Sequence, residues 1–433
     1  GGAPTVGPTG FYYLLGPFRA MERYDLLYRL YEDFDTAAIR DLQTFVDVFP
    51  AVDSRVALDY WQDARAELDT RKAEVRDSFA VGETLVEIAA TADRDHAFTG
   101  LDLHSKYGRA VNVLVLDVDE TLRSAGGTDN EIPRETLHAL TEFHEAGVPI
   151  VICTGQTLEN VKGFLIQGLG NELVHSSDVS IVYETGTGVF TPGHGSQTKR
   201  LLYDELDEEM ISVFDEVRSR VLPEAPDDVA RGIHLQGNEF NVTLKPNFDV
   251  GSPEAERVID RGLVYLVDLL GEAVAAETDE VTTRGSDWAR AYFAAADPEI
   301  EQVFESEGAS VDCAPDEVPE AVTAIFERVD VAYYHADAAE VGSLELNKPR
   351  GVQAALEVLG IDDPFLVVMG DSKSDLRVME WAAENECGIA AAPEHSSAAV
   401  LDHVRSTDGL IFDRGGAAAM LRTIYVMNLL ADL

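Results

Sequence analysis

The sequence predicts an α/β fold whose core is a parallel sheet covered by helices on both faces. Near-continuous apolar runs, such as VNVLVLD at 111–117 and VPIVICTG at 148–155, alternate with amphipathic helical segments. The same alternation returns after Asn347. Strands that are buried on both faces carry unbroken apolar runs, and parallel strands need long, usually helical, connections between them. We therefore expect one sheet domain that is assembled from two separated stretches of the chain.

Residues 1–108 are expected to form an N-terminal helical domain. Between 54 and 79, apolar side chains recur every three or four residues opposite a charged face, which is the pattern of an amphipathic helix. A second helix is expected over 21–31. We expect the apolar clusters of this region, such as FYYLLGPF at 11–18, to pack on the rest of the protein. Contact with a second copy of the chain, giving a homo-oligomer, is the alternative.

The sheet domain is predicted in two parts, 109–185 and 346–433. Its first part has strands and helices in alternation, expected at 111–117, 134–147, 148–155, 157–169 and 178–186. Its second part repeats the alternation, with elements expected at 349–360, 365–371, 374–385 and 387–392. The stretch between them, 186–345, contains strand segments of its own, GIHLQGNEFNVTLKP and VDVAYYHADAAEVGSLEL. We predict that this stretch is a separate domain inserted into the sheet domain.

The charge of the chain excludes several classes of partner. Acidic residues number 79 against 33 basic ones, which gives a net charge of −46. Such a charge repels nucleic acid and anionic membranes, and it opposes folding by self-repulsion unless salt screens it. Lysine is scarce, so the excess arises partly from the loss of basic residues. This pattern is typical of the cytoplasm of a salt-accumulating microbe such as a haloarchaeon, and an acidic protein of an ordinary cell is the alternative.

The cysteines and the hydropathy pattern point to the same compartment. Cys153, Cys313 and Cys387 have no spacing typical of metal ligands, and their odd number does not suggest a disulfide framework. No apolar run approaches the ~20 residues that a membrane-spanning helix requires. We expect a cytoplasmic protein that does not enter a membrane.

A cluster of polar residues follows the first predicted strand. Asp117 ends the strand, Asp119 follows two residues later, and Thr121 follows two residues after that. In open parallel sheets, ligands bind beyond the carboxyl ends of the strands. Carboxylates at such an edge can be balanced by a cation, and an aspartate can attack phosphorus to form an acyl phosphate. The cluster therefore predicts a site for phosphoryl transfer.

Three further motifs occur in order along the chain. Thr154 ends the second strand, Lys348 begins a helix, and GDSKSD at 370–375 places Asp371 and Asp375 after a later strand. Thr154 alone could be the cap of the following helix, or both a cap and a ligand. With the first cluster, these motifs make residues 111–433 resemble the haloacid dehalogenase-like (HAD) superfamily, which has a Rossmann-like core.

The resemblance implies a branch of the superfamily and a catalytic role for four residues. The long insertion lies between Thr154 and Lys348, as in the Cof-type and sugar-phosphatase branch, whose C2-type cap is an α/β domain. Asp117 is implied as the nucleophile and Asp119 as the acid and base. Thr154 and Lys348 are implied to neutralise and hold the transferring phosphoryl group.

The resemblance also implies Mg²⁺ as cofactor and a set of ligands. The implied metal ligands are Asp117, Asp119 through its backbone carbonyl, Asp371, and Asp375 in a supporting position. The implied phosphate ligands are Thr121, Thr154, Gly155 and Lys348. The chain departs from the family pattern at Glu120, Gln156 and Ser374, where relatives often have Gly, Arg and Asn. These departures weaken inference about the substrate.

The function implied is a Mg²⁺-dependent phosphatase that hydrolyses a small phosphorylated metabolite, most simply a sugar phosphate, through an aspartyl-phosphate intermediate. Asp119 favours this over the dehalogenases and ion-pumping ATPases of the superfamily. A phosphomutase and a non-catalytic scaffold that binds partners through its N-terminal helices are the alternatives. Within the insertion, four polar residues of a predicted hairpin are candidates for reading the leaving group, although they could also form a solvated face. They are His234, Asn238, Asn241 and Lys245.

Overall fold

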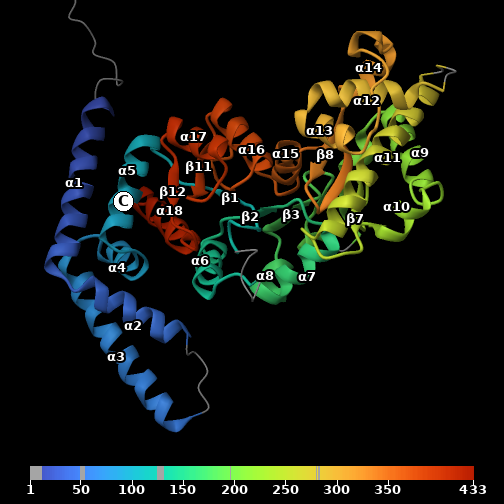
Figure 1. Cartoon of the computed structure of the whole chain (residues 1–433). Helices are drawn as coiled ribbons and strands as arrows, with labels where there is room; N and C mark the ends of the chain where they lie inside the picture. Colours follow the sequence, from blue (N-terminus) through green and yellow to red (C-terminus); the bar gives the residue numbers. More distant parts are fainter. Residues whose placement is uncertain (1–11, 49–53, 124–130, 196, 279, 281–282) are drawn as a thin grey trace, which may run out of the picture. The chain divides into compact units, whose positions relative to one another are not determined.

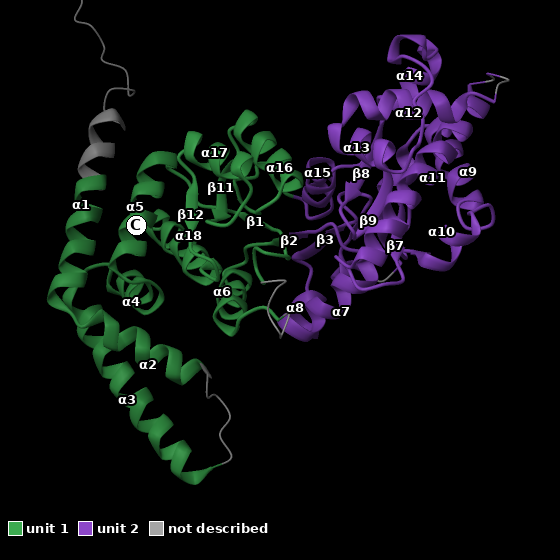
Figure 2. Cartoon of the chain, in the orientation of Figure 1, with its two compact units in different colours: residues 1–150, 361–433 green, residues 151–360 purple. Residues whose placement is uncertain are grey.

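The computed structural model describes residues 12–48, 54–123, 131–195, 197–278, 280 and 283–433 (Figure 1). The chain divides into two compact units, one formed by 1–150 with 361–433 and the other by 151–360 (Figure 2). Within the described ranges, no helix is both long and apolar enough to cross a membrane.

The first unit begins with five helices, as predicted for this region. The helix expected at 54–79 is confirmed as Arg55–Ser78. Ser54 caps it by accepting the Ala57 N–H at 3.5 Å. The helix expected at 21–31 lies within a longer one, and the side chains of 11–18 lie outside the described residues. The five helices are α1 (Tyr12–Asp33), α2 (Thr36–Val48), α3 (Arg55–Ser78), α4 (Gly82–Thr91) and α5 (Arg94–Tyr107).

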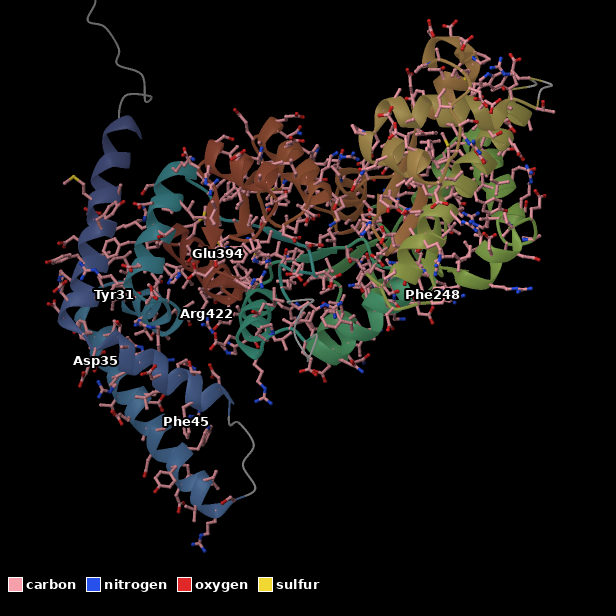
Figure 3. All side chains as sticks on the ribbon, in the orientation of Figure 1. Tyr31, Asp35, Phe45, Phe248, Glu394 and Arg422 are labelled. Atoms are coloured by element: carbon pink, nitrogen blue, oxygen red, sulfur yellow. The ribbon has the colours of Figure 1, made fainter. Side chains whose placement is uncertain are left out.

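These helices share a hydrophobic core with the last helix of the chain, α18 (Ala417–Ala431). Val426 and Leu430 of α18 are buried among apolar side chains of α1 to α5. Gly100 of α5 allows close approach, since a Cβ there would lie 2.9 Å from the Thr423 carbonyl oxygen. Tyr31 of α1, which is labelled in Figure 3, donates a hydrogen bond to the Ala92 carbonyl at 2.7 Å. The buried apolar residues of this region therefore pack on one another and on α18, whereas Met21, Tyr28, Val56 and Tyr60 are more than half exposed.

The sheet of the first unit has four parallel strands in the order β12-β11-β10-β1. Val113 of β1 pairs with Leu366 of β10, and the strands are buried because helices cover them. The strands are β1 (Val113–Leu116), β10 (Leu366–Met369), β11 (Gly388–Pro393) and β12 (Leu410–Phe412). The helices between or beside them are α6 (Arg134–Glu145), α16 (Lys373–Glu384) and α17 (Ala398–Ser406).

The connections place helices on both faces of this sheet. The chain passes from β10 through α16 to β11, and through α17 to β12, moving away from β1. On the other side of β1, the Pro149 carbonyl accepts the Leu114 N–H at 3.0 Å, so the connection through α6 moves in the opposite direction. Because such crossovers are almost always right-handed, α6 covers the face opposite to α16 and α17. The predicted α/β fold class is confirmed.

The second unit begins within β2 (Ile150–Cys153) and continues the alternation of strands and helices. β3 pairs antiparallel with β4, and β4 with β5, so the mostly parallel arrangement ends in two antiparallel strands that we did not predict. The helix α15 (Lys348–Val358) packs on β3 and β4. The other elements of this part are α7 (Leu158–Leu169), α8 (Asn171–Val174), β3 (Val179–Tyr183), β4 (Gly188–Phe190), η2 (Pro192–His194), β5 (Lys199–Leu201) and η3 (Leu202–Glu205).

The remaining residues of the second unit form a separate antiparallel sheet in the order β6-β7-β9-β8. The long helix α11 packs on β6, β7 and β9, where Leu244 of β7 meets Gly262 of α11. The strands are β6 (Ile233–Leu235), β7 (Val242–Pro246), β8 (Val329–Tyr334) and β9 (Ala338–Ser343). The helices are α9 (Glu208–Arg220), α10 (Asp227–Gly232), α11 (Pro253–Glu277), α12 (Gly285–Ala296), α13 (Pro298–Ser306), η4 (Pro315–Glu317) and α14 (Glu320–Phe326).

Candidate active site

Asp117 lies at the carboxyl end of β1. Its backbone N–H donates to the Met369 carbonyl at 2.9 Å, which extends the pairing of β1 with β10 by one residue. Its side chain is only 7% exposed. The apolar residues of β1 thus fix the strand in the core, and the pairing with β10 carries the carboxylate to the edge where both strands end.

Asp371 and Asp375 follow β10 at the same edge. One carboxylate oxygen of Asp375 accepts the backbone N–H groups of Asp371 and Ser372, both at 3.1 Å, and the Ser372 hydroxyl at 2.9 Å. Residue 370 must be glycine, because a Cβ there would lie 2.3 Å from the Asp375 side chain. The GDSKSD motif is therefore a turn that closes around the buried Asp375 carboxylate and begins α16.

Asp117, Asp371 and Asp375 form the carboxylate cluster of the first unit. Each offers an oxygen atom within 4.8 Å of the oxygens of the other two. Oxygen ligands of this type are the ones that Mg²⁺ prefers, and buried carboxylates held so close together are stabilised by a cation. The residues therefore fit the implied metal. Since one Asp375 oxygen already binds backbone N–H groups, Asp375 also orients the turn that carries Asp371.

Asp119 lies outside that cluster, because its carboxylate turns toward Arg123. The Arg123 Nε donates to Asp119 Oδ1 at 2.8 Å, and the backbone N–H groups of Leu122 and Arg123 both bind the Val118 carbonyl. The predicted metal contact of Asp119 through its backbone carbonyl stays a prediction. We did not predict Arg123, because residues 119–123 form a turn between two bridge residues and not a helix, so the spacing of four residues is no signal for the pair.

Glu120 lies between Asp119 and Thr121, and its backbone is left-handed, with a φ of 59°. Glycine adopts this conformation freely, whereas other residues do so at a cost of about 1 kcal/mol, which explains the glycine that relatives often have here. His395 compensates, since its Nε2 lies 2.9 Å from the Glu120 carbonyl oxygen. His395 is distant in sequence, and no local pattern could have predicted this contact.

Thr121 follows Glu120 in this loop, and the surroundings of its hydroxyl support its predicted role as a phosphate ligand. Its side chain is buried, and its hydroxyl makes no hydrogen bond with the residues that the structure describes. A buried hydroxyl without a partner destabilises a protein by about 1–3 kcal/mol, so such groups usually bind a ligand or water. This observation is compatible with the predicted binding of phosphate by Thr121.

Thr154 and Gly155 belong to the second unit and follow β2. The Thr154 N–H donates to the Val182 carbonyl at 2.9 Å, and its hydroxyl accepts the Gln156 N–H at 3.1 Å. The alternative role of Thr154 as a helix cap is wrong. The helix α7 begins three residues later than a cap at Thr154 would require. Thr157 caps it instead, by accepting the Asn160 N–H at 3.4 Å. Thr154 is buried, and Gly155 is exposed.

Lys348 is the first residue of α15 and is only 2% exposed. Asn347 caps this helix, and its Oδ1 accepts the Arg350 N–H at 3.0 Å. Lysine is almost never fully buried unless it has an anionic partner. The burial of Lys348 therefore supports a charge-neutralising role over that of a solvated surface lysine.

A loop at 184–186 brings the site residues of the second unit together. The Thr185 N–H donates to the Thr154 carbonyl at 3.0 Å, and Gly186 lies so close to Asn347 that a Cβ would be 2.0 Å from its carbonyl oxygen. The structure thus gathers the predicted residues in two groups. The first unit holds Asp117, Asp119, Thr121, Asp371 and Asp375, and the second unit holds Thr154, Gly155 and Lys348.

The predicted hairpin of the insertion is confirmed as β6 and β7, in which His234 pairs with Lys245. His234 Nδ1 lies 2.7 Å from Asn247 Oδ1, and Lys245 Nζ donates to Asp337 Oδ1 at 2.8 Å. Asn238 donates its side-chain N–H to the Thr243 hydroxyl. The Asn241 Oδ1 is buried and has no hydrogen-bond partner among the described residues. Contact of these four residues with a substrate stays a prediction.

Comparison with known proteins gives one family match. Residues 114–187 match the family model of haloacid dehalogenase-like hydrolases. This segment carries Asp117, Asp119, Thr121, Thr154 and Gly155. No curated protein matches the chain.

Solved structures show a weaker similarity. A protein from Thermotoga maritima has 14% identity and a TM-score of 0.42, covering 73% of this chain and 97% of its own. A HAD-superfamily phosphatase from Bacteroides thetaiotaomicron has 16% identity and a TM-score of 0.42, with coverages of 74% and 96%. A protein from Thermoplasma acidophilum has 11% identity and a TM-score of 0.41, with coverages of 73% and 100%. TM-scores of this size do not establish a shared fold. The comparisons therefore support one family similarity, between residues 114–187 and the haloacid dehalogenase-like hydrolases.

Proposed function

We propose that the protein is a Mg²⁺-dependent phosphatase of the HAD type. The observation that supports this most directly is the carboxylate cluster, in which Asp117, Asp371 and Asp375 offer oxygens within 4.8 Å of one another at the ends of two paired strands. Asp119 follows two residues after Asp117, as the family mechanism requires. A nucleophile, an acid and a set of oxygen ligands in this order serve phosphoryl transfer.

In the proposed reaction, Asp117 acts as the nucleophile and Asp119 transfers protons. An Asp117 oxygen attacks the phosphorus of the substrate, and the bond from phosphorus to the leaving oxygen breaks while Asp119 gives that oxygen a proton. Asp119 then takes a proton from water, whose oxygen attacks the aspartyl phosphate and releases inorganic phosphate and free Asp117. Bound Mg²⁺ supplies positive charge to the phosphoryl oxygens.

Four residues hold the phosphoryl group in this proposal. Lys348, as a buried cation, balances the negative charge of the transferring group, and the hydroxyls of Thr121 and Thr154 donate to phosphate oxygens. Gly155 adds its backbone N–H and is exposed beside Thr154. None of these residues recognises anything beyond phosphate.

The insertion is proposed to supply recognition of the leaving group, and the substrate is proposed to be a sugar phosphate. Asn238, Asn241 and Lys245 carry amide and ammonium groups that suit hydroxyl oxygens. The buried Oδ1 of Asn241, which lacks a partner among the described residues, supports this role best, because a ligand hydroxyl would satisfy it.

The proposal is tested by a screen for phosphate release in molar KCl with Mg²⁺. The panel contains hexose phosphates, pentose phosphates, nucleoside monophosphates and p-nitrophenyl phosphate. We expect turnover of at least one sugar phosphate above that of the nucleotides. Return of phosphate to another position of the substrate would instead indicate a phosphomutase. No turnover of any compound, with or without Mg²⁺, would favour the scaffold.

A further inference from the structure

The loop after β3 has an unusual backbone. Glu184, Thr185 and Gly186 are three consecutive residues with left-handed φ angles, of 47°, 56° and 94°. Glycine adopts such angles freely, but glutamate and β-branched threonine do so at a cost of about 1 kcal/mol or more each. Strained backbone of this kind persists where the surrounding structure holds it, often at functional sites.

The backbone of this loop contacts both phosphate-binding segments of the second unit. The Glu184 N–H donates to the Gln156 carbonyl at 2.9 Å, and the Thr185 N–H donates to the Thr154 carbonyl at 3.0 Å. Gly186 lies directly against Asn347, the residue before Lys348. The position of the loop is therefore fixed relative to both Thr154 and Lys348.

The Glu184 side chain reaches the insertion. It is 3% exposed, and its two carboxylate oxygens lie 2.9 and 3.1 Å from the backbone nitrogen of Glu239, whose N–H they accept. Glu239 lies in the β6–β7 connection, residues 236–241, which also contains Asn238 and Asn241. The Glu239 carboxylate is held in turn by the Tyr183 hydroxyl and by Lys199 Nζ, both at 2.7 Å.

Burial makes a carboxylate unfavourable at this position. It raises the pKa of Glu184 to about 7, although hydrogen bonds from backbone N–H groups oppose the shift. The charged groups that act on Glu184 are Glu239 and Glu340, which raise its pKa further, and the hydroxyls of Tyr183 and Tyr203 lie in the same network. An ionisable group that is kept in such surroundings is a candidate for a functional role.

We propose that Glu184 is a positioning residue that fixes the β6–β7 connection against the loops that carry Thr154 and Lys348. The connection then presents Asn238 and Asn241 at a constant place relative to the bound phosphate. This part of the inference rests on the proposed function. The hydrogen bond between Glu184 and the Glu239 backbone is independent of it.

The first experiment measures the connection itself, by hydrogen–deuterium exchange of a peptide covering 236–241 in the full chain. Glu184→Gln keeps one acceptor oxygen but replaces a charge-assisted hydrogen bond with a neutral one, so it should speed exchange there about fivefold. Glu184→Met, which has no oxygen acceptor and only a weakly accepting sulfur, should speed it further. The matched control is Glu142→Gln, which neutralises a glutamate of α6 whose pKa is likewise raised by burial. Unchanged exchange in both Glu184 variants would overturn the proposal.

A second experiment uses KM values for the sugar phosphate that the screen identifies and for p-nitrophenyl phosphate. Glu184→Gln should raise KM for the sugar phosphate about fivefold and leave kcat for the aryl phosphate within twofold, while Glu142→Gln changes neither. Faster exchange with an unchanged KM would overturn the link to the substrate. Faster exchange in a protein that hydrolyses nothing would overturn the phosphatase proposal but support the positioning contact.

A third measurement needs no variant and decides the question if the Glu184 variants fail to fold. The Glu239 N–H is the group that the Glu184 carboxylate accepts. In the unchanged protein, exchange of this amide should therefore be at least about tenfold slower than its intrinsic rate. Exchange of the Glu239 amide at its intrinsic rate would overturn the proposal.

Discussion

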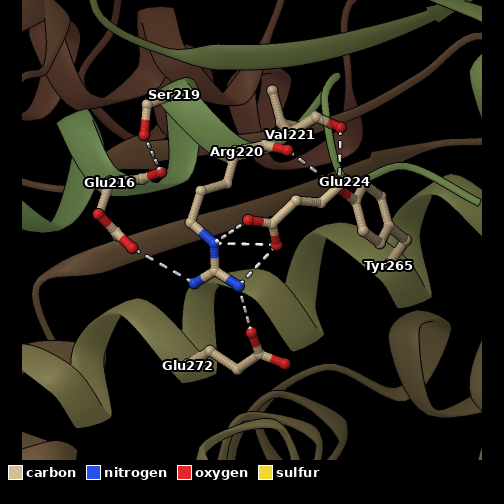
Figure 4. A network of polar contacts seen from close by, with 7 residues as sticks. All are labelled: Glu216, Ser219, Arg220, Val221, Glu224, Tyr265 and Glu272. Carbon is tan, nitrogen blue, oxygen red and sulfur yellow. Dashed lines mark hydrogen bonds and ion pairs between the residues drawn. The ribbon is translucent and has the colours of Figure 1, made fainter.

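Two clusters of acidic side chains in this protein differ in what surrounds them. In the insertion, Glu216, Glu224 and Glu272 surround the guanidinium of Arg220, which bridges α9 and α11 (Figure 4). The Arg220 Nε lies 3.0 Å from Glu224, and one terminal nitrogen lies 2.6 Å from Glu272. About half of the surface of each of these glutamate side chains is exposed. This cluster is an exposed ion-pair network, which stabilises a fold only slightly.

The carboxylate cluster of Asp117, Asp371 and Asp375 has the opposite environment. It lies at the ends of buried strands, and Asp117 and Asp375 are almost completely buried. In a chain with 79 acidic residues, clustering alone therefore carries little information. Position after a buried strand distinguishes the two kinds of cluster, and this position can be read from sequence.

The largest expected effect is that of Asp117→Asn, which should lower phosphate release by more than ~10²-fold because it removes the proposed nucleophile. Asp119→Asn should be nearly as severe, since it removes the proposed proton donor. The matched control is Asp33→Asn, which changes the first aspartate of another DxD sequence that lies at the exposed end of α1. If purified Asp117→Asn kept half of the wild-type rate, the mechanism would be wrong.

Removal of metal should have an effect of similar size. We expect EDTA to abolish phosphate release and added Mg²⁺ to restore it, because the carboxylate cluster fits that ion. Asp371→Asn should raise the Mg²⁺ concentration for half-maximal rate by about tenfold or more, since it neutralises one ligand. Isothermal titration with Mg²⁺ checks the same change without turnover. A rate that is indifferent to EDTA would contradict the assignment of the cluster.

A smaller effect is expected from the pH dependence of stability at Glu184. Its pKa is near 7 in the folded protein and near its ordinary value of 4.5 in the unfolded chain. Its contribution to stability is therefore fully present below about pH 4.5 and is lost as the pH rises through 7, by up to about 3 kcal/mol. Denaturant unfolding in molar KCl at several pH values checks this.

The comparison of wild type with Glu184→Gln isolates this contribution from those of other acids. The difference in unfolding free energy should shift in favour of the variant between pH 5 and pH 8. A difference that is constant over this range would show that Glu184 does not titrate there.

The segments that follow β1 and β10 show which site residues can be predicted from sequence. Asp117, Asp119, Thr121, Asp371 and Asp375 were predicted because they follow apolar strands and match motifs of the HAD superfamily. The alternation of elements predicted a parallel sheet but no strand order, and the structure pairs β1 with β10. The parallel core and the hairpin of the insertion were predicted because their patterns are local.

Glu184 and His395 could not be found in this way. Glu184 binds a backbone N–H that is 55 residues away, and His395 binds the Glu120 carbonyl across 275 residues. Any residue offers a backbone group, so no partner type marks these contacts in the sequence. The left-handed φ angles of Glu120 and Glu184 could not be predicted from sequence either, because glutamate does not favour them.

A further prediction concerns the insertion. Asn241→Ala and Lys245→Ala should raise KM for the sugar phosphate about fivefold, since each removes one hydrogen bond, and leave hydrolysis of p-nitrophenyl phosphate within about twofold. Asp337→Asn is the matched control, because it removes the ion-pair partner of Lys245 but keeps the lysine. Equal losses on both substrates, or no loss on either, would contradict the proposed role of this hairpin in substrate specificity.

The smallest expected effect is that of breaking the exposed cluster. Arg220→Ala should lower Tm by only about 2 °C in molar KCl, because exposed ion pairs contribute little and salt screens them. The decrease should grow as KCl is lowered, since three glutamates then face one another without the guanidinium. Arg257→Ala is the matched control, on the exposed face of α11 and without an ion pair to any described residue. A decrease of 10 °C or more in molar KCl would break the comparison, because the Arg220 cluster would then be as important to the fold as the buried cluster is proposed to be to the chemistry.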